Sequence, residues 1–98
     1  MKIFLDDKRP VPDERYNCVR TYEDCIELLD LFRKVRFISL DYDLGAEKTG
    51  YDVLEYMAEH AISVQHINIH SDHLEGVPKM REFAQQKFPN AVLTYNRS

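Results

Sequence analysis

Short apolar runs alternate along this chain with polar loops and longer amphipathic segments. The apolar runs predict five β-strands, at residues 2–5, 17–20, 37–40, 64–69 and 91–94. Between them, apolar residues spaced three and four positions apart predict helices at about residues 21–34, from residue 50 onward, and at 77–87. Strands that alternate with helices are typical of a parallel sheet with helices packed on it. We therefore predict an α/β fold.

The helix predicted at residues 21–34 has a start signal and an apolar stripe. Thr21 is a suitable N-cap, and Asp24 follows three residues later, as in a capping box. The apolar stripe, which we expect to lie in the core, consists of Ile26, Leu28, Leu29, Leu31 and Phe32. Between the first two strands the crossover helix is expected to be reduced, because Pro10 and Pro12 interrupt that segment. The chain continues for only four residues after the last predicted strand, so a final helix is expected to be missing.

Two acidic pairs stand directly after two of the predicted strands. Asp6 and Asp7 follow the first strand, and Asp41 and Asp43 follow the third. Open parallel sheets bind their ligands at the carboxyl ends of the strands, so these carboxylates are expected to converge there. Carboxylates held close together repel one another unless a cation lies between them, and oxygen ligands favour Mg²⁺ or, alternatively, Mn²⁺. The sequence therefore predicts a divalent-metal site suited to phosphate chemistry.

Composition narrows the class of protein. The chain has 98 residues, of which 44% are hydrophobic and 31% charged, so we expect a single globular domain over residues 1–98. No apolar stretch is long enough to cross a membrane and no signal-peptide pattern is present, which predicts a cytoplasmic protein without a membrane partner. The net charge of −4 argues against broad, non-specific binding of nucleic acid. Cys18 and Cys25 lack metal-binding spacing, so both are expected to be buried, reduced thiols.

The acidic pairs belong to a wider pattern that resembles response-regulator receiver domains. The matching segments are Phe4-Leu5-Asp6-Asp7, Leu40-Asp41-Tyr42-Asp43-Leu44, Gly50-Tyr51-Asp52-Val53-Leu54 and Ile69-His70-Ser71. The resemblance implies a compact flavodoxin-like parallel sheet with strand order 2-1-3-4-5. It implies that Asp6, Asp7 and Asp41 bind Mg²⁺, and that Asp41 accepts a phosphoryl group. The backbone carbonyl of Asp43 would complete the metal shell, and Ser71 matches the hydroxyl residue that ends the fourth strand.

Over nearly its whole length the chain is also similar to a smaller family, the cyclic-phosphate-processing receiver-like domains. This similarity rests on residues 6–12, 39–45, 48–52 and 69–71. It implies a role in handling the cyclic phosphate ends of RNA. Where receivers have a lysine that contacts the phosphoryl group, this chain has Thr94-Tyr95-Asn96-Arg97, so that Arg97 would have to supply the cation. The chain departs from the smaller family at Asp72-His73, where relatives tend to carry a small residue and asparagine.

Several residues near the acidic pairs have side chains that suit phosphate chemistry. Asp41 is either the group that attacks phosphorus or a metal ligand only. His70 suits general acid–base catalysis or, alternatively, a hydrogen bond to a loop. Ser71 is expected either to bind a phosphate oxygen or to cap the next helix. Arg9 and Arg97 are the candidate phosphate-binding cations.

The expected ligand is an RNA end or a nucleotide phosphate. Tyr42 and Tyr51 flank the acidic site and would either stack on a base or pack into the protein. Three other functions stay open: a non-catalytic module that docks on a protein partner, a receiver phosphorylated in signalling, and a haloacid-dehalogenase-like phosphatase. The last shares the Asp41-x-Asp43 motif, but there the motif follows the first strand of the sheet. The sequence leaves the oligomeric state open.

Overall fold

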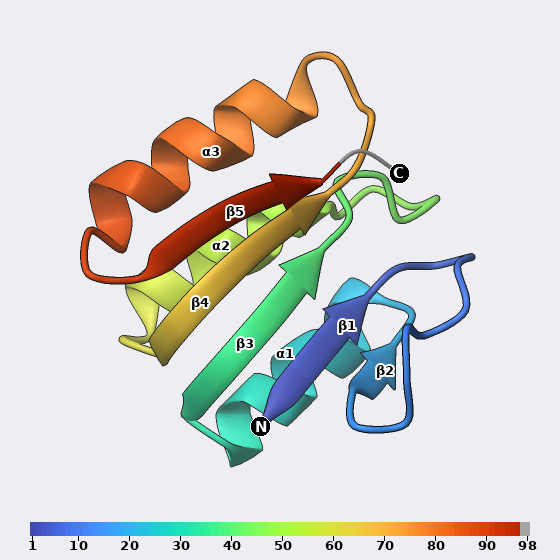
Figure 1. The fold of residues 1–98 in the computed structure, drawn as a ribbon, viewed down its shortest axis with the longest axis horizontal. Coiled ribbons are helices and arrows are strands. Elements are labelled where there is room, and N and C mark those ends of the chain that lie inside the picture. The colour runs from blue at the N-terminus through green and yellow to red at the C-terminus, as the bar shows by residue number, and fades with distance from the viewer. Residues whose placement is uncertain (97–98) are drawn as a thin grey trace.

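The apolar runs form one parallel sheet in the computed structural model, which describes residues 1–96. Its strands are β1 (Lys2–Leu5), β2 (Asn17–Val19), β3 (Lys34–Leu40), β4 (Ser63–His70) and β5 (Val92–Asn96). They lie in the order β2-β1-β3-β4-β5, as Figure 1 shows. Every neighbouring pair is parallel. The predicted α/β fold class and its strand order are therefore confirmed.

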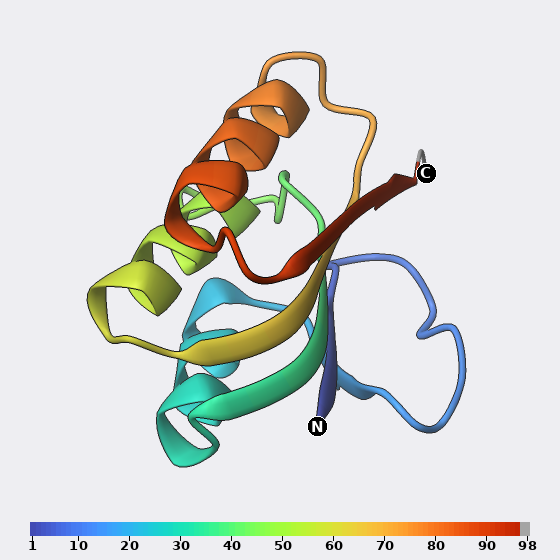
Figure 2. The same ribbon diagram turned by 60° about the vertical axis from the view of Figure 1, so that its left-hand side comes forward.

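The three helices found within residues 1–96 cover the same face of the sheet. They are α1 (Tyr22–Leu31), α2 (Gly50–Glu59) and α3 (Gly76–Lys87). Each connects a strand to one further along the sheet in the same direction, and because such crossovers are right-handed, the helices lie together on one side (Figure 2). Their apolar side chains form one core with those of the central strands, Ile3, Leu5, Ile38, Leu40, Ile67 and Ile69. No helix in residues 1–96 is long and apolar enough to span a membrane.

The opposite face of the sheet carries no helix within the described residues. The segment between β1 and β2 contains no helix, and its loop at residues 6–16 lies on this side of the sheet (Figure 2). The ring of Tyr16, at the end of that loop, contacts the rings of Phe4 and Phe37. Side chains on alternate strand positions face this side, where Ser39, Asn68 and other polar groups bond to one another. We call this surface the helix-free face.

The first helix ends earlier than its apolar pattern predicts. α1 ends at Leu31, and Phe32 takes an extended backbone conformation. The side chains of Leu31 and Phe32 are 70% and 50% exposed, so their assignment to the buried stripe is wrong. Lys34 already belongs to β3, because the chain must turn at Arg33 to pair with β4; the carbonyl of Arg33 accepts from the amide of Ser63 (2.9 Å).

The two cysteines differ in exposure. Cys25, in α1, is fully buried in the core, and this burial raises the pKa of its thiol to about 12. Cys18 is exposed, which contradicts the expectation that both thiols are buried. The reason is that Cys18 lies on the edge strand β2, opposite Phe4, where no helix covers it.

We expect an aromatic disulfide reagent to modify one thiol per native chain at pH 8 and two after denaturation, because only a thiolate within reach of the reagent reacts. Absorbance of the released thiolate measures the stoichiometry. A Cys18→Ser variant should lose the fast-reacting thiol. Two fast-reacting thiols in the native protein would contradict the burial of Cys25.

Candidate functional site

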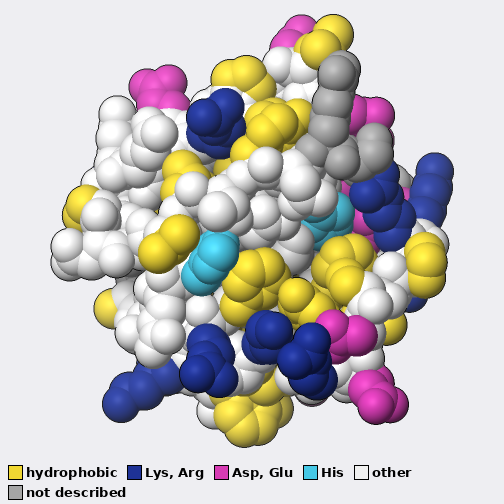
Figure 3. Space-filling model, in the orientation of Figure 1, with side chains coloured by type: hydrophobic (Ala, Val, Ile, Leu, Met, Phe, Trp, Pro, Cys, Tyr) yellow, Lys and Arg dark blue, Asp and Glu magenta, His cyan; other side chains and the backbone are white. Residues whose placement is uncertain are grey.

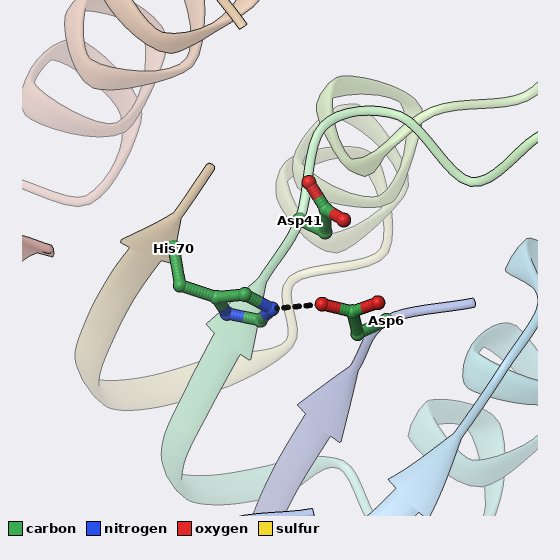
Figure 4. A group of neighbouring side chains, drawn as sticks. All are labelled: Asp6, Asp41 and His70. Atoms are coloured by element: carbon green, nitrogen blue, oxygen red, sulfur yellow. Dashed lines mark hydrogen bonds and ion pairs between the residues drawn. The ribbon is translucent and has the colours of Figure 1, made fainter. Parts of the chain in front are cut away.

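Asp6 and Asp41 meet at the carboxyl edge of the sheet because their strands are neighbours. Leu5 and Leu40 are paired between β1 and β3, and the amide of Asp41 donates to the carbonyl of Leu5 (3.0 Å). Figure 4 shows both carboxyl groups beside the imidazole of His70, the last residue of β4. Each of these three side chains offers one ligand atom, and the three atoms lie within 4.8 Å of one another. The structure thus brings together two of the four predicted metal ligands, Asp6 and Asp41, and two of the predicted catalytic residues, Asp41 and His70.

The carboxylate of Asp6 is only 1% exposed and is held from three sides. Its Oδ1 accepts from the amides of Lys8 (2.9 Å) and Arg9 (3.0 Å), and its Oδ2 accepts from Nε2 of His70 (3.0 Å). Burial acts to raise the pKa of Asp6, but the two amide hydrogen bonds and His70 outweigh it, so the pKa lies below its usual value. Asp6 is therefore an ionised carboxylate with a fixed orientation.

Hydrogen bonds determine which nitrogen of His70 carries the proton. Nδ2 of Asn68 donates to Oγ of Ser39 (3.0 Å), which directs the Ser39 hydroxyl proton toward Nδ1 of His70 (2.6 Å). Nδ1 accepts, so Nε2 carries the proton that is donated to Asp6. Burial lowers the pKa of His70, and the ring stacks on Phe4 with centroids 4.6 Å apart. Both ring nitrogens bond within the protein, and an acid–base role for His70 stays a prediction.

The surroundings of Asp41 disfavour its ionised form, whereas those of Asp6 favour it. Burial raises the pKa of Asp41 to about 6, the negative charges of Asp6 and Asp7 act in the same direction, and a hydrogen bond with Ser71 opposes them. Gly50, the first residue of α2, lies so close to Asp41 that an added Cβ would be 2.0 Å from the backbone oxygen of Asp41. The absence of a side chain at Gly50 is thus what lets α2 start against the site.

The acidic side chains line a pocket of about 260 Å³ and fit a hard divalent cation. Asp6, Asp7 and Asp41 offer the carboxylate oxygens that Mg²⁺ prefers. A cation would relieve the repulsion by Asp6 and Asp7, which adds to burial in raising the pKa of Asp41. Asp43 differs: its side chain is exposed and its Oδ1 accepts from the amide of Gly45 (2.8 Å), which stabilises the turn. A contact through the backbone carbonyl of Asp43 stays a prediction.

The three predicted phosphate-binding residues have different surroundings. Arg9 lines the pocket, with its Nε 3.9 Å from Oδ2 of Asp6. Ser71 is buried beside Asp41, and its Oγ also accepts from the amide of His73 (3.2 Å). Since α3 begins only at Gly76, Ser71 does not cap it. Arg97 lies outside the described residues, and β5 itself contains no lysine or arginine.

The structure favours packing over base stacking for the two tyrosines near the site. The ring of Tyr42 lies against His73, with centroids 4.4 Å apart, and the ring of Tyr51 lies against Phe83 at 5.2 Å. Both rings are partly buried against the core. Tyr42 also occupies the space that a side chain at Gly76 would need.

The sequence did not predict that Ser39 and Asn68, on the helix-free face, would form a hydrogen-bonded chain to His70. Ser39 was part of a predicted apolar strand, and Asn68 was part of an alternating one. The available signal was that alternation, because polar residues at 66, 68 and 70 are separated by Ile67 and Ile69. It indicates a strand with one polar face, although it does not reveal which residue binds His70.

A parallel sheet of this order, with carboxylates at its carboxyl edge, defines a receiver-like α/β protein. The chain belongs to the family of the cyclic-phosphate processing receiver domain, whose sequence profile matches residues 1–86. The family resemblance is thereby confirmed. Searches of curated proteins and of solved structures found no significant match.

Proposed function

We propose that this protein opens terminal cyclic phosphates of RNA in a Mg²⁺-dependent reaction at the pocket that contains Asp6 and Asp41. The observation that carries the proposal is the convergence of these carboxylates with Arg9 and Ser71 in one pocket. Membership of the cyclic-phosphate processing family supports the choice of phosphate ester. Water is the second reactant: a bond forms between its oxygen and phosphorus, one ring P–O bond breaks, and the released ribose oxygen takes the proton.

The residues of the chain divide this task between them. Asp6, Asp7 and Asp41 would hold Mg²⁺, which when bound neutralises negative charge on the phosphate. Arg9 lines the same pocket, and a guanidinium suits two phosphate oxygens at once. His70 is a positioning residue, because it bonds to Oδ2 of Asp6 and is itself held by Ser39.

Phosphorus NMR of an RNA oligomer that ends in a cyclic phosphate tests the proposal. In Mg²⁺, the native protein should convert the cyclic signal to that of a phosphomonoester, and Asp41→Asn should lower the rate by at least about 100-fold, since it removes a carboxylate from the site. Asp24→Asn is the matched control, because Asp24 is exposed on α1 and outside the pocket. It should act at the native rate.

Chelation of Mg²⁺ should abolish the conversion by the native protein. No conversion by the native protein in Mg²⁺ would overturn the proposal. Equal rates for the native protein and Asp41→Asn would place the reaction elsewhere and would overturn it as well.

A further inference from the structure

A second cavity lies on the helix-free face, against the loop at residues 6–16. Its volume is about 390 Å³, compared with about 260 Å³ for the acidic pocket. Sites for small ligands typically measure about 300–1,000 Å³. Figure 3 views this face and shows hydrophobic side chains near its centre, histidines beside them, and lysines or arginines along its border. The proposed function uses Arg9, His70 and Ser39 from the lining of this cavity, but assigns no ligand to the cavity itself.

One side of this cavity is aromatic. Phe4, Tyr16 and Phe37 line it, and Tyr16 contacts the other two rings edge-on, with centroid distances of 6.3 and 5.7 Å. Nζ of Lys2 lies 4.8 Å from the centroid of Tyr16. Aromatic rings with a cation beside them are suited to a flat, electron-rich ligand, and proteins that bind single-stranded RNA use such rings to stack bases.

The other side of the cavity is polar, and its side chains are hydrogen-bonded to one another. It contains Ser39, Asn68 and Asn96, which are joined through the side chain of Asn68. Thr94 donates to Oδ1 of Asn68 (2.7 Å), and His66 bonds to Thr94 (2.8 Å). Amide and hydroxyl groups of this kind recognise the edges of bases and the hydroxyls of ribose.

The cavity adjoins the acidic pocket. Arg9 lines both, and His70, which lines the cavity, bonds to Asp6, which lines the acidic pocket. A ligand with a phosphate in the acidic pocket would therefore place its neighbouring group in the cavity. In an RNA end, that group is the ribose and base of the last nucleotide.

We infer that the cavity on the helix-free face binds the nucleoside that carries the terminal phosphate, with its base against Phe37 and Tyr16 and its polar edge toward Asn68 and Asn96. The inference rests on the proposed function for the position of the phosphate. It assigns recognition of the RNA end to the helix-free face, beside the acidic pocket. It also explains how a chain with a net charge of −4 can select a single nucleotide end.

Binding of adenosine 3′-monophosphate tests this inference, because the compound carries base, ribose and phosphate but no cyclic bond to open. The measurement is an amide NMR titration in Mg²⁺ of the native chain, Phe37→Leu and Phe83→Leu. Phe83 is the matched control, since it is also half-buried but lies in α3, which packs on the other face. Ribose 5-phosphate, which lacks a base, is the second probe.

We expect the amide signals of Ser39 and Asn68 to shift with adenosine 3′-monophosphate. Phe37→Leu should raise Kd about tenfold, which corresponds to about 1.4 kcal/mol, while Phe83→Leu should stay within about twofold of the native value. All three proteins should bind ribose 5-phosphate equally. Asn96→Ala, at an exposed position, should also raise the Kd for adenosine 3′-monophosphate. This variant replaces Phe37→Leu in the test if Phe37→Leu does not fold.

Equal Kd values for the native chain and the cavity variants, or shifts confined to the acidic pocket, would overturn the inference. These outcomes are independent of turnover. Weaker binding of adenosine 3′-monophosphate by Phe37→Leu, together with no opening of cyclic phosphate by the native protein, would uphold the nucleoside site and reject the proposed reaction. If Phe37→Leu opens the cyclic phosphate with the native rate and KM, the proposed reaction is upheld and the nucleoside site is rejected.

Discussion

Replacement of Gly50 by alanine is expected to destabilise the protein by about 3 kcal/mol, the upper part of the range for overpacked sites. In most helical positions the same change is stabilising. Here the added Cβ would lie 2.0 Å from the backbone oxygen of Asp41 and 3.0 Å from Cε of Met80. The amide of Gly50 also donates to the carbonyl of Tyr42 (3.0 Å), so neither segment can move independently. Thermal unfolding should show a Tm about 15 °C below the native value.

Gly45→Ala is the matched control for this prediction. Gly45 has a φ of +69°, which disfavours alanine, but its added Cβ would approach only the side-chain Oδ2 of Asp7 (2.9 Å). Because that carboxylate can rotate away, the expected loss is limited to the backbone strain of about 1 kcal/mol. Equal losses at Gly45 and Gly50 would contradict the steric argument for Gly50.

The position of the carboxylates could be predicted because it depends on local pattern and on one rule of topology. Apolar runs followed directly by Asp6 and Asp41 mark strand ends, and parallel neighbours place those ends at one edge. The order of the strands came from the family resemblance. The sequence could not reveal that His70 would bond to Asp6, since the two residues are 64 positions apart and meet only after β1, β3 and β4 are in register.

The errors in the prediction arose where pairing between strands overrides local preference. The apolar pattern through Leu31 and Phe32 suits a longer helix, yet β3 must begin at Lys34 to pair with Ser63. Tertiary pairing of this kind is not visible in helix propensity. Cysteine is a residue type that is usually buried, and Cys18 is exposed only because it lies on an edge strand.

The helix-free face follows from the missing crossover helix, which the prolines of the first loop did predict. What could not be predicted is that polar and aromatic side chains would form a cavity there. Phe4, Phe37 and Ser39 belong to runs that local pattern assigns to a buried core. Their contacts depend on Tyr16, which reaches them from the loop before β2.

Asp41→Asn is expected to raise the stability of the protein without metal and to abolish its response to Mg²⁺. The change keeps the shape of the side chain but removes a charge that burial and the carboxylates of Asp6 and Asp7 disfavour, as the raised pKa of Asp41 indicates. Because solvent screens part of this repulsion at a half-buried group, we expect about 1 kcal/mol, or a Tm about 5 °C higher in a chelator at pH 7.5.

In the native protein, Mg²⁺ at about 100 times its Kd should add about 2.7 kcal/mol of stability, because it binds only the folded chain. Asp41→Asn should show no such increase, so that the order of Tm values reverses between chelator and Mg²⁺. Asp24→Asn, the exposed control, should follow the native protein in both conditions. A lower Tm for Asp41→Asn in the chelator, or an undiminished rise of its Tm with Mg²⁺, would show that Asp41 is not a metal ligand under electrostatic strain. The predicted reversal thus separates a carboxylate retained for metal binding from one that stabilises the fold.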